Sequence, residues 1–580
     1  MKKSVSSPNR IYFLSMILVM LMTVLVYLPS AFHVARSDQE NYFAETAHLK
    51  GLTDTVVHTY SYSRQRIFFS GDFQMFKPLY FVLLAAEKEV FGFNPFGWQV
   101  AGIILHLLVV WQLFRLLYLI SPGIGAVFVS GYFAVMLITQ DMVTFQHMNI
   151  CLVAHILILE SFIGLIKYID SNFLKRKYFY KILGCVAAAC FLREFSLVYT
   201  VIIFCGLIAY QLYASWSLRP LSLTDKATLI SRIKLWLWLW APIVVYMIWN
   251  VTDYWARVKA ALNVEHVFFS VKPALHFIGL SWWGGLIPGL IKYHMPVFPQ
   301  NRVIAEFPSF SLMITMMVDV IGIIGIVSFI IFLKKKKINF LNSRLLTGWA
   351  ALLCSLSYAV IVTWGRFQDR GMESLYYNMY YFYAPVFFNM IFGYVVYSTV
   401  AGACKCRHIK IVNYLLGLAL ILFGAWNAWG NYRLNLHLEK ESRPLIARQK
   451  NVGFRNYFLS KRYNALGFYS AQQGQWQTAA HEDLAAIIVD PQNADAYFNL
   501  GIVYFNAQDF KNAASYLTRA LFLTKDKSHI YYNRAVAYIK LQEFDKALDD
   551  LNEVMLLSPL NSQARQLRDY LSRSTHSIIR

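Results

Sequence analysis

The sequence predicts an all-α protein in two parts, a polytopic bundle of about eleven transmembrane helices followed by a short α-solenoid. Composition predicts the bundle, because 57% of the 580 residues are hydrophobic and only 15% are charged. The mean hydropathy of +0.43 agrees, since a soluble globular protein of this size does not need so much apolar surface. A repeat with a period of 34 residues near the C-terminus predicts the solenoid.

Eleven apolar stretches are candidate crossings of a hydrocarbon layer about 30 Å thick. They lie at residues 11–31, 98–119, 123–140, 148–167, 180–192, 196–213, 235–252, 310–333, 345–364, 381–400 and 411–429. The fifth and sixth belong to one run that is too long for a single helix and carries Arg193 and Glu194 at its middle. Because a charged pair at the bilayer centre is costly, we predict that the helix breaks there, near the outer surface. The segment 275–294, which contains several glycines and a proline, is expected to lie in the outer interface.

Basic residues predict the orientation of these spans. They are concentrated at the N-terminus and in the loops at residues 167–181, 219–234, 334–344 and 405–410. The positive-inside rule places these segments, and the N-terminus, on the cytoplasmic side. An odd number of spans then puts the chain after residue 430 on the outer side of what we expect to be a bacterial cytoplasmic membrane. The net charge of +22 follows from this bias and from attraction to anionic lipids, so nucleic acid is not an expected partner.

The last third of the chain repeats itself. Three similar segments begin at Tyr463, Tyr497 and Tyr531, which are 34 residues apart, and share small and aromatic positions. This pattern resembles the tetratricopeptide repeat (TPR), whose arrays bind peptides or partner proteins. The predicted domains are residues 1–430 as the membrane bundle with a large first outer loop at 32–97, 431–459 as a basic linker, 460–561 as three TPRs, and 562–580 as a capping helix and tail.

The first outer loop carries a series of motifs in a recognisable order. Asp38 comes soon after the first span, followed by Lys77-Pro78-Leu79, the turn at Phe91–Gly97, and a helix that contains Leu105–Leu108. This segment resembles the GT-C superfamily of integral-membrane glycosyltransferases, which use polyprenyl-phosphate sugars. A TPR array after the last span is similar to the transmembrane-and-TPR O-mannosyltransferases and their bacterial relatives. The chain departs from that branch at Tyr380, where an arginine is usual.

The resemblance implies attack of an acceptor hydroxyl on the sugar and departure of the lipid phosphate. The hydroxyl needs a base, and the phosphate needs positive charge or a metal. The catalytic candidates are Asp38, Glu40 and Asp141, which are also the candidate ligands of a divalent cation, Mg²⁺ or Mn²⁺. The candidate phosphate-binding residues are Lys77, Arg64, Arg66, Arg366 and Arg370, and the candidate acceptor or sugar contacts are His147, Tyr380 and Tyr383.

Simpler interpretations stay open for these residues. Asp38 could belong to a solvated loop, Asp141 and His147 to polar helix ends, and the tyrosines to an interfacial aromatic belt. His106, inside a span, is interpreted as a hydrogen bonder between helices. Two other functions also stay open, a non-enzymatic membrane anchor for a TPR scaffold in envelope assembly and a transporter of lipid-linked sugars. A scaffold needs no long charged first loop, and a transporter is expected to carry its ionisable residues within the spans.

Overall fold

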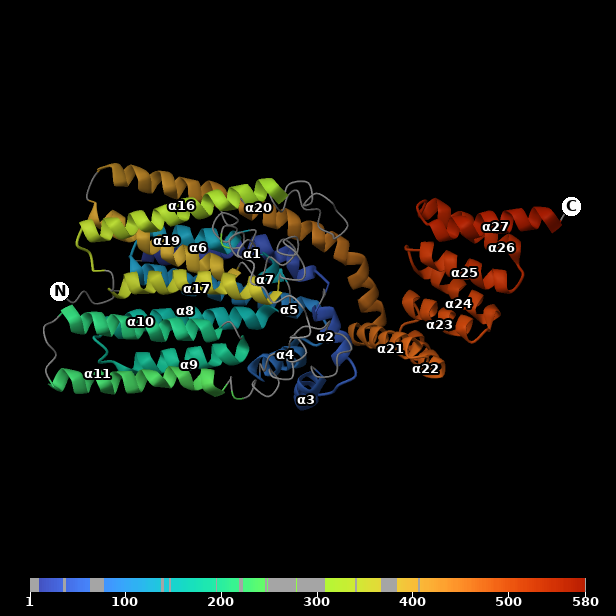
Figure 1. Ribbon diagram of the computed structural model, residues 1–580, viewed down its shortest axis with the longest axis horizontal. Coiled ribbons are helices and arrows are strands. Elements are labelled where there is room, and N and C mark those ends of the chain that lie inside the picture. The colour runs from blue at the N-terminus through green and yellow to red at the C-terminus, as the bar shows by residue number, and fades with distance from the viewer. Residues whose placement is uncertain are drawn as a thin grey trace.

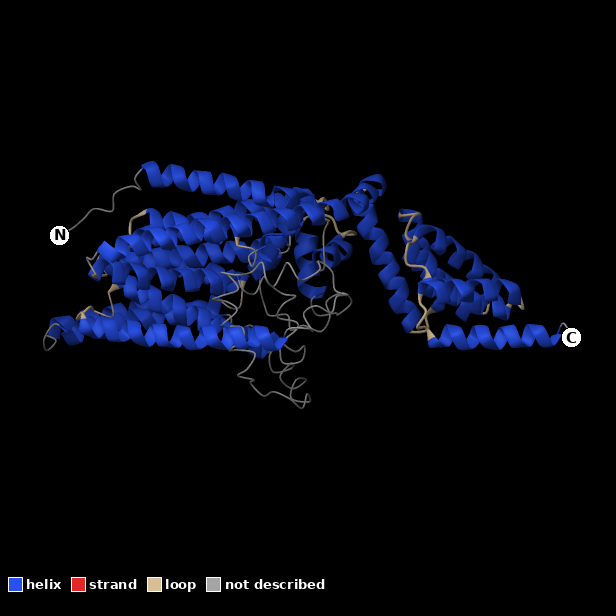
Figure 2. Ribbon diagram, turned by 90° about the horizontal axis from the view of Figure 1, so that it is seen from above, coloured by secondary structure: helices blue, strands red, loops and turns tan. Residues whose placement is uncertain are grey.

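The computed structural model describes most of the chain: residues 10–34, 38–62, 78–136, 140–144, 148–193, 196–217, 223–245, 248, 278, 308–339, 342–366, 383–404 and 407–578. In these ranges the regular secondary structure is entirely helical. Figure 1 shows a bundle of long, roughly parallel and antiparallel helices and, beside it, a stack of short helices at the C-terminus. The view from above in Figure 2 shows the same division.

The bundle follows the apolar stretches of the sequence. Its helices are α1 (Arg10–Tyr27) with η1 (Leu28–Phe32), α5 (Pro95–Ile120), α6 (Ile124–Val135), α8 (Asn149–Asp170), α9 (Arg176–Leu192), α10 (Ser196–Ser217), α11 (Leu223–Trp236) with η4 (Leu237–Trp240), α16 (Pro308–Lys335), α17 (Ser343–Arg366), α19 (Tyr383–Ala403) and the first part of α20 (Arg407–Val452). Each of the eleven predicted stretches overlaps one of these helices.

Five helices in the described part of the chain are long and apolar enough to cross a membrane. They cover residues 10–32, 95–120, 149–170, 383–403 and 411–452, and two shorter apolar helices cover 124–135 and 196–212. The protein thus has several candidate membrane spans, and the count of eleven stays a prediction. The predicted break in the long apolar run is confirmed, because α9 ends at Leu192, Arg193 is extended, and α10 begins at Ser196. Glu194 and the segment 275–294, apart from Ile278, lie outside the described residues.

The helix ends and loops are divided between two ends of the bundle. The start of α1 and the turns that follow α8 and α16 lie at one end, and the solenoid lies beyond the other (Figure 1). At the first end, Arg232 Nη2 donates to the carbonyl oxygen of Asn172 at 3.3 Å, and Ser343 Oγ donates to Asp170 Oδ1 at 2.5 Å. The basic segment Lys334–Lys337 follows α16 at this end. The first loop and the solenoid lie toward the other end, and the orientation of the chain in a membrane stays a prediction.

A single helix connects the bundle to the solenoid. α20 runs for 46 residues with Pro444 inside it, so most of the segment predicted as a linker continues the helix of the last span. Asn431 and Asn435 lie one turn apart on its buried face. Asn431 Nδ2 donates to the carbonyl oxygen of Val135 at 2.8 Å, and Asn435 Nδ2 donates to that of Val26 at 3.1 Å. These amides satisfy carbonyl groups at the ends of α6 and α1, so α20 is fixed to the bundle rather than loosely tethered.

The solenoid consists of three helical hairpins and a last helix. Its elements are α21 (Phe454–Gln472), α22 (Trp476–Val489), α23 (Ala494–Asn506), α24 (Phe510–Leu523), α25 (Ser528–Lys540), α26 (Phe544–Leu557) and α27 (Ser562–Ile578). The repeated small residues allow close approach within each hairpin. A Cβ atom at Gly501 of α23 would lie 2.8 Å from Leu517 Cγ of α24, for example. α27 buries Ala564 and Leu571 in the core it shares with the last hairpin, as expected for a capping helix.

Candidate functional site

The described part of the first loop lies between the bundle and the solenoid. It forms three short helices, α2 (Asp38–Thr46), α3 (Leu52–Tyr62) and α4 (Pro78–Phe91), at the end of the bundle near α21 (Figure 1). Phe43 of α2 is fully buried, and its ring centroid lies 5.3 Å from that of Trp98 on α5. Phe43 also contacts Phe458 of α21, with 5.0 Å between ring centroids. The first helix of the solenoid therefore packs directly on α2.

Ion pairs reinforce this contact, which we call the α2–α21 junction. Lys461 of α21 pairs with Glu40, and Arg462 Nη1 lies 2.9 Å from Glu45 Oε2. Glu45 is only 3% exposed, so its carboxylate would be costly to bury without this partner. Burial favours a lower pKa for Lys461, but the neighbouring Glu40 carboxylate outweighs it and raises that pKa. The junction is thus an apolar contact flanked by two complementary charge pairs.

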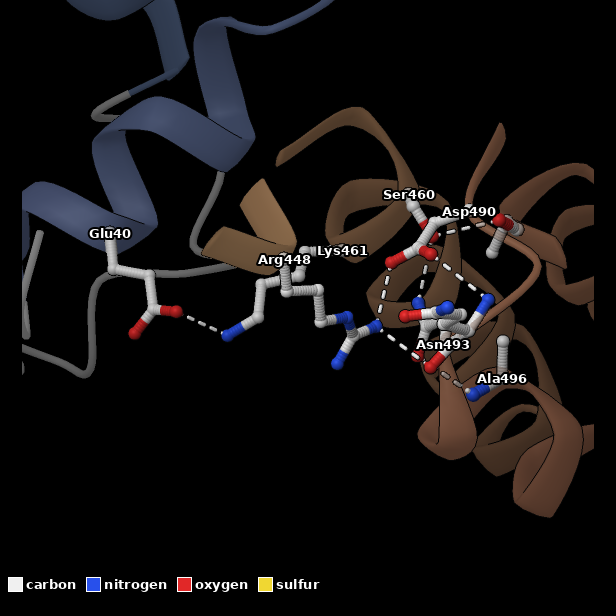
Figure 3. Close-up of polar contacts among 9 residues, drawn as sticks. Glu40, Arg448, Ser460, Lys461, Asp490, Asn493 and Ala496 are labelled. Carbon is white, nitrogen blue, oxygen red and sulfur yellow. Dashed lines mark hydrogen bonds and ion pairs between the residues drawn. The ribbon is translucent and has the colours of Figure 1, made fainter. Parts of the chain in front are cut away.

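The stalk helix α20 is tied to the same region. Arg448 Nη2 donates to Asp490 Oδ2 at 2.7 Å and to the carbonyl oxygen of Gln492 at 2.8 Å. Asn493 Nδ2 donates to Ser460 Oγ at 2.8 Å, and Asn493 Oδ1 accepts from the backbone N–H of Ala496 at the start of α23. Figure 3 shows these contacts beside the Glu40–Lys461 pair. The stalk, the first repeat and the second repeat therefore form one continuous polar network next to α2.

The two helices that carry Asp38 and Asp141 both contact α5. Asp38 is the first residue of α2, and Asp141 lies in α7 (Gln140–Thr144); the side chains of both lie outside the described part. On α2, the ring centroid of Tyr42 lies 6.2 Å from that of Trp98. On α7, the carbonyl oxygen of Val143 accepts from Gln99 Nε2 at 3.0 Å. Both helices thus border the same turn of α5.

Glu40 has a different setting from the one predicted. The sequence predicts a catalytic or metal-binding role beside Asp38, but the Glu40 carboxylate pairs with Lys461 of the solenoid. Among the described residues, no group of three or more His, Cys, Asp and Glu side chains could hold a metal ion. Since the side chains of Asp38 and Asp141 are outside that set, a Mg²⁺ or Mn²⁺ site stays a prediction.

Tyr383, a predicted acceptor or sugar contact, lies in the described part of the chain. It is fully buried, its hydroxyl forms a 2.8 Å hydrogen bond with His106 Nδ1, and its ring stacks on His155 at 5.2 Å. A side chain enclosed in the bundle in this way does not support the predicted sugar contact. The interpretation of His106 is confirmed, because its Nε2 also lies 2.9 Å from the carbonyl oxygen of Ala134 on α6.

The side chains of the remaining predicted site residues lie outside the described part of the chain. Arg366 ends α17, with a side chain outside the described part. The others lie outside the described residues altogether: Arg64, Arg66, Lys77, His147, Arg370 and Tyr380. Sequence reasoning missed Glu45 and Arg462, whose partnership depends on contact between segments more than 400 positions apart.

Truncating Phe458 is expected to loosen the junction. Phe458→Ala removes a fully buried ring and leaves a cavity, which typically costs about 3–5 kcal/mol. Amide hydrogen exchange in α2 of the full-length protein should therefore become at least about tenfold faster. Phe468→Ala, on the same helix but 47% exposed, is the matched control and should leave α2 unchanged. Equal protection of α2 in the two variants would show that the contact does not hold this helix.

Comparison with known families identifies the C-terminal part of the chain. Models described as tetratricopeptide repeat match residues 469–528 and 528–559. Among solved structures, the TPR domain of Arabidopsis OM64 is similar, with 24% identity, coverage of 20% of this chain and 98% of that chain, and a TM-score of 0.20. Comparison with curated proteins finds no match. The chain thus combines candidate membrane spans with TPRs, which mediate contacts between proteins.

Proposed function

We propose that the protein is a GT-C-type glycosyltransferase that transfers a sugar from a polyprenyl-phosphate donor to a protein or glycan acceptor. Its TPR array would recruit the acceptor or a partner protein. One observation carries this proposal: α21, the first helix of the array, packs on α2, the helix that begins with Asp38. A module that binds proteins therefore lies beside the loop that the GT-C resemblance designates as catalytic.

The chemistry requires little beyond a base and positive charge. A phosphate is already a tolerable leaving group, so the main need is to take the proton from the acceptor hydroxyl. Asp38 serves as that base, and Asp141 completes the acceptor or metal site from the neighbouring helix α7. The cations of the first loop, including Lys77, stabilise the departing phosphate. Support for pairing the two carboxylates comes from the shared position of α2 and α7 beside Trp98 and Gln99.

The proposed location is the cytoplasmic membrane of a bacterium, with the N-terminus in the cytoplasm and the array outside. The charge distribution supports this orientation, since Lys334–Lys337 follow α16 at the end of the bundle remote from the array. Transfer at the outer surface would then meet acceptors that have already been exported.

A membrane-anchored TPR scaffold is the second candidate. It is favoured by the part of the chain that the family models match, because TPRs alone account for residues 469–559. The rigid attachment of α20 to the bundle would suit such a scaffold as well as an enzyme.

Transfer can be tested with the full-length protein in lipid nanodiscs. We would supply a panel of radiolabelled polyprenyl-phosphate hexoses together with exported proteins and follow label in the protein fraction. We expect label from one donor class. A chain ending at Val489, which keeps α21 and α22 and so the α2–α21 junction, should transfer less to protein acceptors. No transfer from any donor, with partner proteins still retained by the array, would favour the scaffold.

A further inference from the structure

A group of buried polar side chains lies beside the junction, outside the ion pairs described above. It combines Tyr42 of α2, Glu87 of α4 and Asn149 at the start of α8. Asn149 Nδ2 donates to Glu87 Oε1 at 3.0 Å and to the carbonyl oxygen of Trp98 at 2.9 Å. Asn149 is fully buried, and Tyr42 is 3% exposed. We call these three side chains the Glu87 cluster.

Close packing fixes the position of Asn149. A Cβ atom at Gly102 of α5 would lie 2.7 Å from Asn149 Oδ1, so only glycine allows α5 and α8 to approach this closely. With one side against Gly102 and the other bonded to Trp98, Asn149 holds Oε1 of Glu87 in place. Asn149 is therefore a positioning residue for the Glu87 carboxyl group.

Three polar atoms of the cluster have no hydrogen-bond partner among the described residues: Tyr42 Oη, Glu87 Oε2 and Asn149 Oδ1. Burial is the main cause that raises the pKa of the Tyr42 phenol, and the nearby Glu87 carboxyl adds to the effect, yet no direct hydrogen bond joins the two groups. Native proteins pair the great majority of buried polar atoms, because an unpaired one forfeits its bonds to water. Three such atoms on three different helices, with the Glu87 carboxyl held by Asn149, indicate a ligand that supplies hydroxyl groups.

The protonation state of Glu87 indicates which class of ligand the cluster would bind. Burial raises the pKa of this carboxyl to about 8, against the opposing effect of the Asn149 hydrogen bond. At pH 7 the group is therefore mostly neutral, and it can donate and accept, as can the Tyr42 phenol. Neither side chain carries the positive charge that would attract a phosphate. The adjacent Lys88 points elsewhere, since its Nζ donates to Thr55 Oγ1 of α3 at 2.8 Å.

We propose that the Glu87 cluster is a subsite for the hydroxyl groups of a neutral sugar ring, with Glu87 and Tyr42 as direct contacts. The choice of a sugar, rather than another polyhydroxyl compound, rests on the proposed function. The position fits that use, because Tyr42 belongs to the helix that begins with Asp38. The subsite would hold the transferred sugar, or a sugar acceptor, next to the catalytic carboxylate.

Direct binding tests the subsite independently of transfer. Saturation-transfer NMR would measure how tightly the full-length protein in nanodiscs binds four sugars: methyl mannoside, methyl glucoside, methyl galactoside and methyl N-acetylglucosaminide. Glu87→Leu and Tyr42→Phe should each lower the affinity for the sugar by about tenfold, which is the effect of losing one well-placed hydrogen bond. Glu87→Gln keeps size and neutral hydrogen bonding, so it should stay within about threefold of the wild type. Glu89→Leu, on the same helix and exposed, is the matched control and should bind as the wild type does.

The outcomes separate this subsite from the proposed function. Wild-type affinity in Glu87→Leu and Tyr42→Phe, or no binding of any of the four sugars, would overturn the subsite even if transfer is observed. If only those two variants lose affinity for the sugar, the subsite is upheld even if the protein transfers nothing. Circular dichroism and gel filtration of each variant exclude misfolding as the cause of weaker sugar binding. Sugar binding that is retained in Glu87→Gln gives a second check.

Discussion

Replacing Asp38 with asparagine is expected to lower the rate of sugar transfer by about 100-fold or more. The substitution keeps the size of the side chain but removes its charge and its ability to take a proton, and general-base catalysis typically contributes about 10²–10⁴-fold. Asparagine is also well tolerated at a helix start, so α2, which begins at this residue, should stay intact. The loss should appear in kcat more than in KM, because the base acts in the transition state.

Two further variants make this result interpretable. Asp54→Asn changes an exposed carboxylate in the same loop, on α3, and should leave transfer unchanged. Glu40→Gln removes the partner of Lys461, so it should weaken the α2–α21 junction and reduce transfer less than Asp38→Asn does. Expression and membrane insertion should match the wild type in all three variants. If Asp38→Asn transfers sugar at the wild-type rate, the assignment is wrong and Asp141 becomes the next candidate.

Replacing Asp483 with leucine is expected to stabilise the TPR array by about 2–4 kcal/mol. Asp483 occupies a core position of the first repeat that is leucine in the other two, Leu517 and Leu551, and all three side chains are fully buried. Within the described residues, no cationic side chain pairs with Asp483. Leucine should fit, because Leu517 packs on Gly501 in the same way as Asp483 packs on Gly467. The expected rise in Tm is about 10 °C for an array of this size.

The stability difference should grow with pH. Burial raises the pKa of the Asp483 carboxyl to about 8 from an ordinary value of 3.8, although the Asn499 amide acts in the opposite direction. Between these two values the folded array holds a proton that the unfolded chain has released. The wild-type array should therefore lose stability as pH rises from about 4 to about 8 and level off above that range.

Thermal melts of residues 453–580, followed by circular dichroism at several pH values, would measure both effects. We expect a helical spectrum and a cooperative transition for this fragment, and a smaller pH slope in Asp483→Leu than in the wild type. The reciprocal change Leu517→Asp in the second repeat is the matched control and should destabilise the array. A lower Tm in Asp483→Leu would mean that the carboxyl group makes a favourable contact in this core.

The sequence alone predicted the features that depend on neighbouring residues. Apolar stretches predicted the helices of the bundle, and the charged pair that includes Arg193 predicted the end of α9 at Leu192. The period of 34 residues predicted the TPRs that the family models match. These predictions succeed because hydrophobic periodicity, helix breaking and repeat spacing are local properties, which each segment carries wherever it later packs.

The tertiary structure decided which of these segments meet. The pairing of Glu40 with Lys461 joins residues 421 positions apart, and that of Glu87 with Asn149 joins residues 62 positions apart. No local pattern distinguishes these carboxylates from solvated ones, because their partners arrive only when α2, α4, α8 and α21 pack together. Tyr383 shows the same limit, since its hydroxyl was free to be a sugar contact until α5 and α19 enclosed it with His106. Contacts between distant segments depend on the relative placement of whole helices, and that placement is set by the packing of the entire chain.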